Sequence, residues 1–225
     1  MATRAVVVDG DNTLWRGRVT EGIGKAILMQ ELRRLHLPTV ARGLKGKSEI
    51  EEMLAIRNGF EGEMIAQEML YGLLLANGLG RRDEMYRIAA DYIRGRLIGT
   101  VFRMVDMQLG LGGMAFLATA AGTSAATFAQ MDLFRRELTG SRHNREIFDD
   151  SGRLRGFKTA IASGEEKLHA TEQMLAGHGL TLRDCRVVGD SGLDRPMLMS
   201  AQKAYASPYA TDEVKAIKGI VQIRA

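Results

Sequence analysis

Apolar residues gather in four short runs that have the length and composition of buried strands. The runs are RAVVV (4–8), MAFLA (114–118), CRVV (185–188) and IVQI (220–223). They show little of the apolar–polar alternation expected of a strand with one solvated face. Unalternated runs of this kind are typical of a parallel sheet that helices cover on both faces. The pattern therefore predicts an α/β fold built on a parallel sheet.

Helical periodicity fills most of the chain between the first two runs. Apolar residues recur at intervals of three and four in the ranges 20–35 and 61–75, and the ranges 48–58 and 81–98 are similar. Each range is bounded by Gly, Ser, Thr or Asn, which favour the ends of helices. We therefore predict a helix in each of these four ranges.

This helical block is too long to be a single crossover between neighbouring strands, and it indicates an insertion. We predict that residues 16–100 form an inserted helical domain. The core domain would then consist of residues 1–15 and 101–225, with helices on both faces of its sheet.

Composition and charge are those of an ordinary globular protein. Of the 225 residues, 45% are hydrophobic and 26% are charged, and the net charge of +4 is too small to indicate a nucleic-acid-binding protein. The single cysteine, Cys185, excludes an internal disulfide and fits a reducing cytoplasm. Asp9 and Asp11 interrupt the apolar run at the N-terminus, so we predict no signal peptide. The uncharged residues 107–131 are rich in small and polar residues, and we predict a strand with flanking loops there rather than a membrane span.

Two aspartates, Asp9 and Asp11, end the first apolar run in the stretch VVVDGDNTLW (6–15). Residues i and i+2 of an extended chain point the same way, so both side chains should lie beyond the C-terminal end of the strand. Open α/β sheets bind their ligands at that edge. Two carboxylates about 6 Å apart repel by roughly 3 kcal/mol at an effective dielectric near 20. Either a hard cation such as Mg²⁺ removes this repulsion, or one aspartate caps the turn while the other is solvated.

A second acidic pair follows another Val-rich run in VVGDSGLDRPML (187–198). Asp190 ends that run and Asp194 comes four residues later. Asp194 is also a good N-cap for a helix with Pro196 in its first turn, a role that is compatible with a place near a metal. Two strands that each bring acids to one edge of a sheet favour a metal site there.

Together these motifs resemble the signatures of the haloacid-dehalogenase superfamily of phosphohydrolases. DGDNT (9–13) matches the DxDxT signature and GDSGLD (189–194) matches the GDxxxD signature. FDDSGRLRG (148–156), followed by SGEEKL (163–168), resembles the phosphoserine-phosphatase-like branch. The helical insertion resembles the cap domain of that branch in its position and its helical character. The resemblance implies a Rossmann-like α/β core with a parallel sheet and an inserted α-helical cap domain.

The family also has a hydroxyl group at the end of a strand, and two threonines compete for this position. Thr119 ends the run FLAT, and Thr123 follows the turn AAG. The resemblance favours Thr119 because the run stops at that residue, although a strand-end hydroxyl can also simply cap the next helix.

The lysine of the family signature matches Lys167, and Lys158 is a weaker candidate. Ser163 and Glu166 have the spacing of a capping box, which predicts a helix that begins there. Lys167 would lie in its first turn, where the helix dipole disfavours a cation by roughly 0.3–1 kcal/mol. A phosphate or aspartate partner would explain this placement better than a solvated surface lysine would.

Three positions depart from the family pattern. Gly10 stands where a bulky apolar residue is common, and we expect looser packing there without effect on a reacting group. Asn12 replaces a frequent glycine and can adopt the same left-handed conformation. Arg18 stands where a true phosphoserine phosphatase is expected to have a glutamate that recognises the substrate. The sequence therefore does not name the substrate.

The resemblance implies a two-step phosphoryl transfer. Asp9 would attack phosphorus and form an aspartyl-phosphate, and Asp11 would protonate the leaving alcohol and later deprotonate the attacking water. Asp9, the main-chain carbonyl of Asp11, and Asp190 would bind Mg²⁺. Asp194 would support this site through a bridging water or by contacting the residues that bind the ion. Thr119 and Lys167 would bind the phosphoryl oxygens.

The function implied is that of a Mg²⁺-dependent phosphatase acting on a small phosphomonoester. A phosphotransferase on the same scaffold and a non-catalytic protein that binds a phosphorylated ligand are the alternatives. The expected partner is a small phosphorylated metabolite, with neither nucleic acid nor membrane involved, and the sequence leaves the oligomeric state open.

Overall fold

The computed structural model describes residues 4–34 and 60–224. Six strands form one sheet in the order β3-β2-β1-β6-β7-β8, and every neighbouring pair is parallel. The strands are β1 (Ala5–Val8), β2 (Met114–Ala118), β3 (Gly140–Arg142), β6 (Cys185–Gly189), β7 (Lys203–Ala206) and β8 (Val221–Gln222). All four apolar runs are strands of this sheet. The strands β3 and β7 were not predicted, because they are short and carry polar residues.

Eight helices are described along with the sheet. They are α1 (Val19–Arg34), α4 (Phe60–Ala76), α5 (Arg82–Arg94), α6 (Gly99–Gly110), α7 (Thr123–Met131), α8 (Gly164–Ala176), α9 (Arg195–Ser200) and α10 (Asp212–Lys215), with a 3-10 turn at η1 (Leu182–Asp184). The helices predicted over 20–35, 61–75 and 81–98 correspond to α1, α4 and α5. The prediction over 48–58 lies outside the described residues. Helix α5 ends four residues earlier than predicted, and Gly95 occupies its C-cap position.

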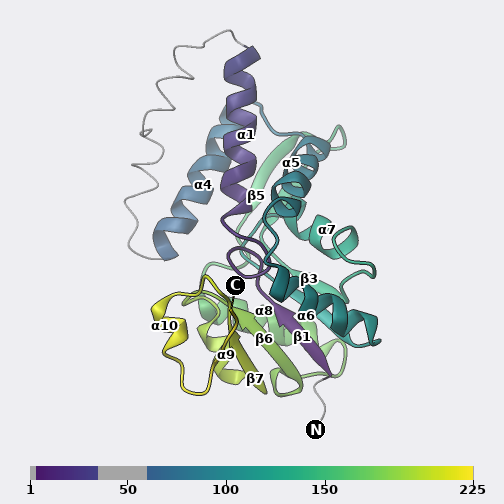
Figure 1. The fold of residues 1–225 in the computed structure, drawn as a ribbon. Helices are drawn as coiled ribbons and strands as arrows, with labels where there is room; N and C mark the ends of the chain where they lie inside the picture. Colours follow the sequence, from purple (N-terminus) through teal and green to yellow (C-terminus); the bar gives the residue numbers. More distant parts are fainter. Residues whose placement is uncertain (1–3, 35–59, 225) are drawn as a thin grey trace.

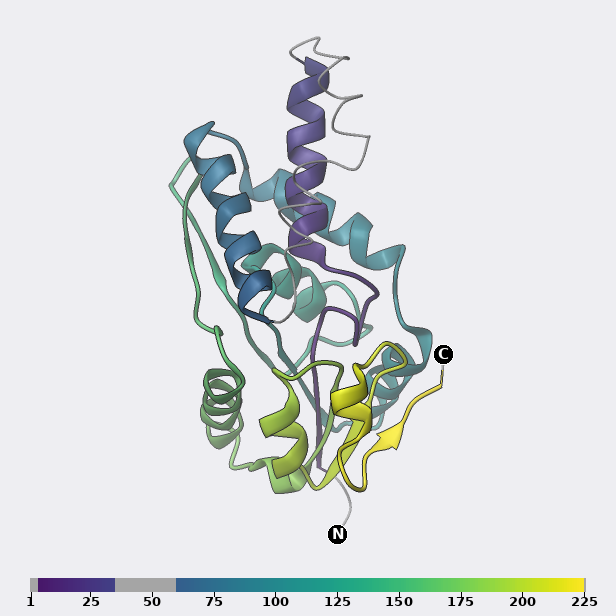
Figure 2. The ribbon, with the colours of Figure 1, turned by 90° about the vertical axis from the view of Figure 1, so that its left-hand side faces the viewer.

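Helices cover both faces of the sheet, as predicted. Alternate residues of β1 belong to two separate apolar clusters: Val6 and Val8 pack with α6 and α7, whereas Ala5 and Val7 pack with α8 and α9. Figure 2 shows the sheet between α8 on one side and α6 on the other. Because each face has its own helical cover, every residue of β1 is buried.

Helices α1, α4 and α5 stand beyond the C-terminal edge of the sheet (Figure 1). An antiparallel hairpin of β4 (Arg145–Phe148) and β5 (Leu154–Lys158) packs beside them. The rings of Tyr71 in α4 and Phe157 in β5 stack with their centroids 4.1 Å apart. The assignment of residues 16–100 to an inserted domain is kept as a proposal. Among the described residues, no helix has both the length and the apolar composition needed to cross a membrane.

The chain passes between the sheet and these helices twice, and the two connections pair with each other. The backbone N–H of Arg16 donates to the carbonyl of Arg96 at 2.8 Å, and that of Ile98 donates to the carbonyl of Leu14 at 3.0 Å. The connections therefore lie side by side next to the loop that follows β1.

Candidate active site

Three neighbouring strands deliver a polar residue to the same edge of the sheet. Asp9 directly follows β1, Thr119 directly follows β2, and Asp190 directly follows β6. Because β1 lies between the other two and all three are parallel, their C-terminal ends meet at one place. The three side chains line one cavity of about 160 Å³, together with Asp11 and Lys167. The sequence had predicted all five residues for the site.

The acidic groups of the two motifs come together at the base of this cavity, although Asp194 does not line it. Carboxylate oxygens of Asp9, Asp190 and Asp194 all lie within 4.8 Å of one another, and all three residues are buried. Asp9 and Asp190 are separated by 181 positions in the chain but by only one strand pairing in the sheet. The structure therefore supplies the convergence of acids that the two motifs predicted.

Lys167 is buried against two of these acids. Its Nζ atom lies 2.5 Å from Oδ1 of Asp9 and 2.7 Å from Oδ1 of Asp194, and only 1% of the residue is exposed. The alternative of a solvated surface lysine is wrong for Lys167. It describes Lys158 instead, which is exposed on β5 and does not line the cavity.

The helix that carries Lys167 begins as predicted, with one difference in its cap. The hydroxyl of Ser163 accepts the backbone N–H of Glu166 at 3.2 Å. The carboxylate of Glu166 accepts the N–H of Ala162 at 2.7 Å, rather than that of Ser163. This start of α8 places Lys167 one turn from the cap, facing the end of β1.

Asp194 organises the loop that carries Asp190. Its Oδ2 atom accepts the backbone N–H groups of Asp190 at 2.9 Å and of Ser191 at 3.2 Å. Although Asp194 occupies the N-cap position of α9, its side chain makes no capping hydrogen bond. The capping alternative is therefore wrong, and both oxygens of Asp194 are engaged by the loop and by Lys167.

The remaining carboxylate oxygens fit a divalent cation. Oδ1 of Asp9 binds Lys167, and Oδ1 of Asp190 accepts the hydroxyl of Thr13 at 3.0 Å. Within the described residues, no hydrogen bond is formed to the Oδ2 atom of either aspartate. Two buried carboxylate oxygens without donors, beside a third acid that holds the loop, suit the oxygen coordination that Mg²⁺ prefers.

Asp11 is oriented by a contact that sequence reasoning missed. Its Oδ1 atom accepts the indole Nε1–H of Trp15 at 2.5 Å and the backbone N–H of Val19, the first residue of α1, at 3.1 Å. Asn12 between them has φ of +55°, the left-handed conformation predicted for it. The only tryptophan of the chain, four residues after Asp11, was the available signal.

Thr119, rather than Thr123, is the hydroxyl that lines the cavity. The Thr123 hydroxyl accepts the backbone N–H of Glu146 at 3.1 Å and so belongs to the contact between α7 and β4. The Thr119 hydroxyl accepts the N–H of Ala121 at 3.2 Å, which does not use its own hydrogen. Arg18 and Tyr209 also line the cavity, and Tyr209 follows the unpredicted strand β7.

No protein-family model and no curated protein sequence matches the chain. Solved structures do match it. A phospho-aspartyl intermediate analogue of phosphoserine phosphatase superposes with a TM-score of 0.68 at 18% identity, over 100% of this chain and 95% of that chain. A substrate-bound phosphoserine phosphatase complex gives 0.66 at 17% identity, over 100% and 95%. A HAD family hydrolase from Salmonella enterica subsp. enterica serovar Typhi gives 0.67 at 16% identity, over 99% and 67%.

The chain has the haloacid-dehalogenase fold. The matches extend over the whole of this chain, including the helices beyond the sheet edge. These structural matches agree with the family resemblance of the two acidic motifs. Both motifs lie at the C-terminal edge of the sheet in this haloacid-dehalogenase fold.

Gly10, one of the departures from the family motif, lies against Trp15. A Cβ atom at Gly10 would lie 2.6 Å from the indole ring of Trp15 and 2.8 Å from the hydroxyl oxygen of Thr119. The expectation of looser packing at Gly10 is therefore wrong, because the indole ring occupies the space. A side chain at this position would also approach Thr119, which lines the cavity.

We expect Gly10→Ala to lower the free energy of unfolding by about 1–3 kcal/mol, because the added methyl group overlaps a ring that cannot move without releasing Asp11. Urea unfolding measures this loss. Gly110→Ala is the matched control, since a Cβ atom there meets nothing within 4 Å. Equal unfolding midpoints for the two variants would contradict this account of the packing.

Burial sets the charge state of the candidate site in the absence of a cation. It raises the pKa of Asp9 from 3.8 to about 7, against the attraction of Lys167. Burial likewise raises the pKa of Asp190 well above its ordinary value, and the charges of Asp9 and Asp194 add to the effect. For Lys167, burial lowers the pKa, but the carboxylates of Asp194 and Asp9 outweigh burial and raise it. A divalent cation would favour the ionised carboxylates and reverse their shifts.

The stability of the cation-free protein should therefore fall as pH rises from 4 to 7. Between 3.8 and about 7 the folded state binds more protons at Asp9 than the unfolded state does, so the free energy of unfolding decreases with pH. Mg²⁺ should offset this loss only where Asp9 is ionised. We expect Mg²⁺ to raise the melting temperature by several degrees at pH 8 and by much less at pH 5, as measured by scanning calorimetry. An equal increase at both pH values would show that Mg²⁺ binds elsewhere.

Proposed function

We propose that this protein is a Mg²⁺-dependent phosphatase that hydrolyses a small phosphomonoester through an aspartyl-phosphate intermediate. The observation that carries the proposal is the cavity in which Asp9 meets Lys167, Asp11, Thr119 and Asp190. A solved structure of similar fold is a phospho-aspartyl intermediate analogue, which supports an aspartate as the nucleophile. The volume of about 160 Å³ is below the roughly 300–1,000 Å³ of pockets for drug-sized ligands, and it supports a small substrate.

Asp9 is the proposed nucleophile. A carboxylate oxygen of Asp9 would form a bond to phosphorus while the bond between phosphorus and the leaving oxygen breaks. The hydrogen bond from Lys167 to Oδ1 holds the carboxylate in one orientation and leaves Oδ2 for this attack or for a cation. In the second step water attacks the aspartyl-phosphate, and phosphate leaves Asp9 as the free carboxylate.

Asp11 is the proposed general acid and base. It would give its proton to the leaving alcohol in the first step and take a proton from the attacking water in the second. The indole of Trp15 and the first N–H of α1 fix the orientation of its carboxylate. Asp11 lines the same cavity as Asp9, which a proton transfer at the reacting oxygen requires.

Lys167 and Thr119 are proposed to bind the phosphoryl oxygens, because they supply a cation and a hydroxyl donor beside Asp9. Asp9, the main-chain carbonyl of Asp11, and Asp190 would hold Mg²⁺, with Asp194 behind them. When bound there, Mg²⁺ would neutralise charge on the carboxylates and on the phosphoryl group. Residues 16–100 are proposed to form a cap that excludes water and contacts the leaving group.

Hydrolysis of p-nitrophenyl phosphate tests the proposal. We expect release of p-nitrophenol with Mg²⁺, loss of activity after addition of EDTA, and recovery with excess Mg²⁺. A panel of small phosphorylated metabolites, assayed with and without acceptor alcohols, would then identify the substrate and separate hydrolysis from phosphoryl transfer. Binding of phosphorylated compounds without turnover of any of them would indicate a non-catalytic protein.

A further inference from the structure

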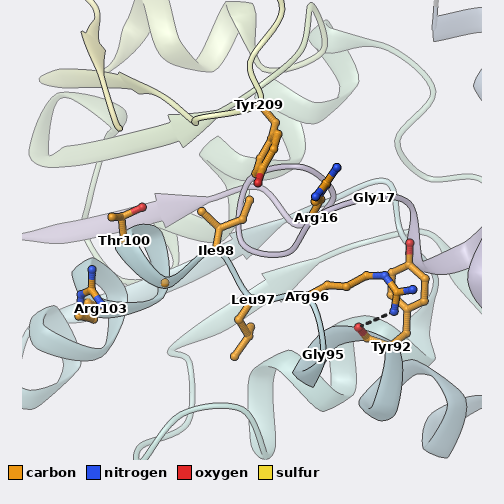
Figure 3. A pocket seen from close by; sticks show the side chains of 11 residues that line it. Arg16, Gly17, Tyr92, Gly95, Arg96, Leu97, Ile98, Thr100, Arg103 and Tyr209 are labelled. Carbon is orange, nitrogen blue, oxygen red and sulfur yellow. Dashed lines mark hydrogen bonds between the residues drawn. The ribbon is translucent and has the colours of Figure 1, made fainter. Parts of the chain in front are cut away.

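A second cavity of about 600 Å³ lies beside the catalytic one. Its polar and aromatic lining is made by Arg16, Tyr92, Arg96, Thr100, Arg103 and Tyr209 (Figure 3). Tyr209 lines both cavities, and 43% of the residue is exposed. The proposed reaction uses none of these residues.

The charged residues that line this cavity are arginines. Arg16 follows β1, Arg96 lies between α5 and α6, and Arg103 lies in the second turn of α6, whereas no acid among the described residues lines the cavity. Within the described part of the chain, none of the three arginines forms an ion pair. The guanidinium of Arg96 lies 4.0 Å from the ring centroid of Tyr92, and that of Arg16 lies 5.3 Å from the ring centroid of Tyr209. The guanidinium groups of Arg96 and Arg16 therefore lie over aromatic rings and are not paired with any described acid.

The positive end of α6 adds to this charge. Its N-cap residue, Ile98, has no side-chain acceptor, and its first turn contains no acid. A Cβ atom at Gly99 would lie 3.7 Å from Nη1 of Arg103, so this guanidinium lies near the first turn. The hydroxyl oxygen of Thr100 is buried there, and no described residue offers it a hydrogen bond. A cation at the N-terminus of a helix is unfavourable unless an anion joins it.

The charges are spread along the cavity. Figure 3 shows Arg103 and Thr100 at one end, and Arg16 and Arg96 toward the other. Cations at both ends of a cavity of about 600 Å³ suit a longer molecule with several anionic groups better than a single phosphate. Guanidinium groups bind phosphate oxygens through paired, charge-assisted hydrogen bonds. We propose that this second cavity binds an elongated polyanion of the phosphate class, separately from the phosphoryl group that reacts.

The position of the cavity connects such a ligand to the catalytic loop. Arg16 and Arg96 belong to the two paired connections between the sheet and the helices. Trp15, which orients Asp11, directly precedes Arg16. The polyanion can therefore be the distal part of a substrate that passes Tyr209, or a separate ligand that contacts the catalytic loop from outside.

Calorimetric titration with tripolyphosphate in the presence of EDTA tests the proposal. Without a divalent cation the catalytic cavity presents the three acids Asp9, Asp11 and Asp190. Its two cations, Lys167 and Arg18, are already paired with acids, so anion binding there is disfavoured. We expect tripolyphosphate to bind more tightly than inorganic phosphate at constant ionic strength. Arg103→Gln and Arg96→Gln, one at each end of the cavity, should each weaken binding about tenfold. Arg87→Gln, an exposed position of α5 outside the cavity, is the matched control.

Undetectable binding by the wild type, or equal affinities in wild type and both cavity variants, would overturn the proposal. The titration needs no turnover, so its outcome is independent of the proposed phosphatase activity. Two kinetic measurements identify the source of the polyanion. For a distal substrate group, a bisphosphate should have a lower KM than the corresponding monophosphate in the wild type, and Arg103→Gln should remove the difference. For a separate ligand, tripolyphosphate at constant free Mg²⁺ should change kcat for saturating p-nitrophenyl phosphate, and Arg103→Gln should abolish the change.

Discussion

Asp9→Asn is expected to lower kcat for p-nitrophenyl phosphate by at least about 10⁴-fold, because an amide cannot form the aspartyl-phosphate. Asparagine has nearly the same shape as aspartate, and Lys167 keeps its 2.7 Å contact with Asp194, so the fold should persist. Burial already disfavours the charge on Asp9, as its pKa of about 7 indicates. The substitution removes that charge without creating a cavity. Circular dichroism and the hydrolysis assay, run on the same preparation, measure fold and activity.

Asp91→Asn is the control for this substitution, since Asp91 is exposed on α5 and lines neither cavity. It should retain wild-type kcat. Activity of Asp9→Asn within tenfold of the wild type would exclude Asp9 as the nucleophile. A folded but inactive Asp9→Asn protein that becomes phosphorylated from substrate would exclude it as well.

Lys167→Met is expected to lower the free energy of unfolding by about 3–5 kcal/mol in cation-free buffer, because it leaves two buried carboxylates without their counterion. Asp9 and Asp194 are 5% and 0% exposed, so water cannot replace the ammonium group. The loss should be greater at pH 8 than at pH 5, since burial raises the pKa of Asp9 and protonation relieves the repulsion at low pH. We also expect kcat with Mg²⁺ to fall about 10²–10³-fold, through loss of a cation beside the phosphoryl group.

Lys158→Met is the matched control, because it removes an exposed lysine from β5. It should change the free energy of unfolding by less than about 0.5 kcal/mol. Urea unfolding in EDTA and in Mg²⁺ measures both variants. If Lys167→Met unfolded at the same urea concentration as Lys158→Met, the buried ion pairs of Lys167 could not contribute to stability.

Strand positions were predictable where packing is the same on both faces. The runs at 4–8, 114–118 and 185–188 are largely buried between two layers of helices, so nearly all of their residues are apolar and the signal was almost continuous. The strand at 203–206 and the hairpin at 145–158 escaped prediction because most of their residues are exposed or only partly buried. Their short, mixed sequences have no periodicity that distinguishes a strand from a loop.

Much of the candidate site could be predicted for a related reason. Asp9, Thr119 and Asp190 each follow a strand directly, and in a parallel sheet the ends of neighbouring strands meet at one edge. The positive charge of Lys167 in the first turn of a helix indicated an anionic partner, because the helix dipole disfavours an unpaired cation there. The contact of Trp15 with Asp11 left only a weak signal, a tryptophan four residues after the acid, because an indole near a loop is equally consistent with ordinary packing.

The sequence by itself determined the parallel sheet, the acids at its edge and the helix that carries Lys167. These features follow from local rules: burial of strand faces, direction of strand ends and capping of a helix. Only the tertiary structure decided that Asp194 holds a loop instead of capping a helix, that the ring of Trp15 fills the space beside Gly10, and that three arginines share one cavity. Arg16 is far from Arg96 and Arg103 in the chain, and the orientations of Asp194 and Trp15 depend on the side chains packed around them. Packing of the whole molecule sets these arrangements, and no local pattern records them.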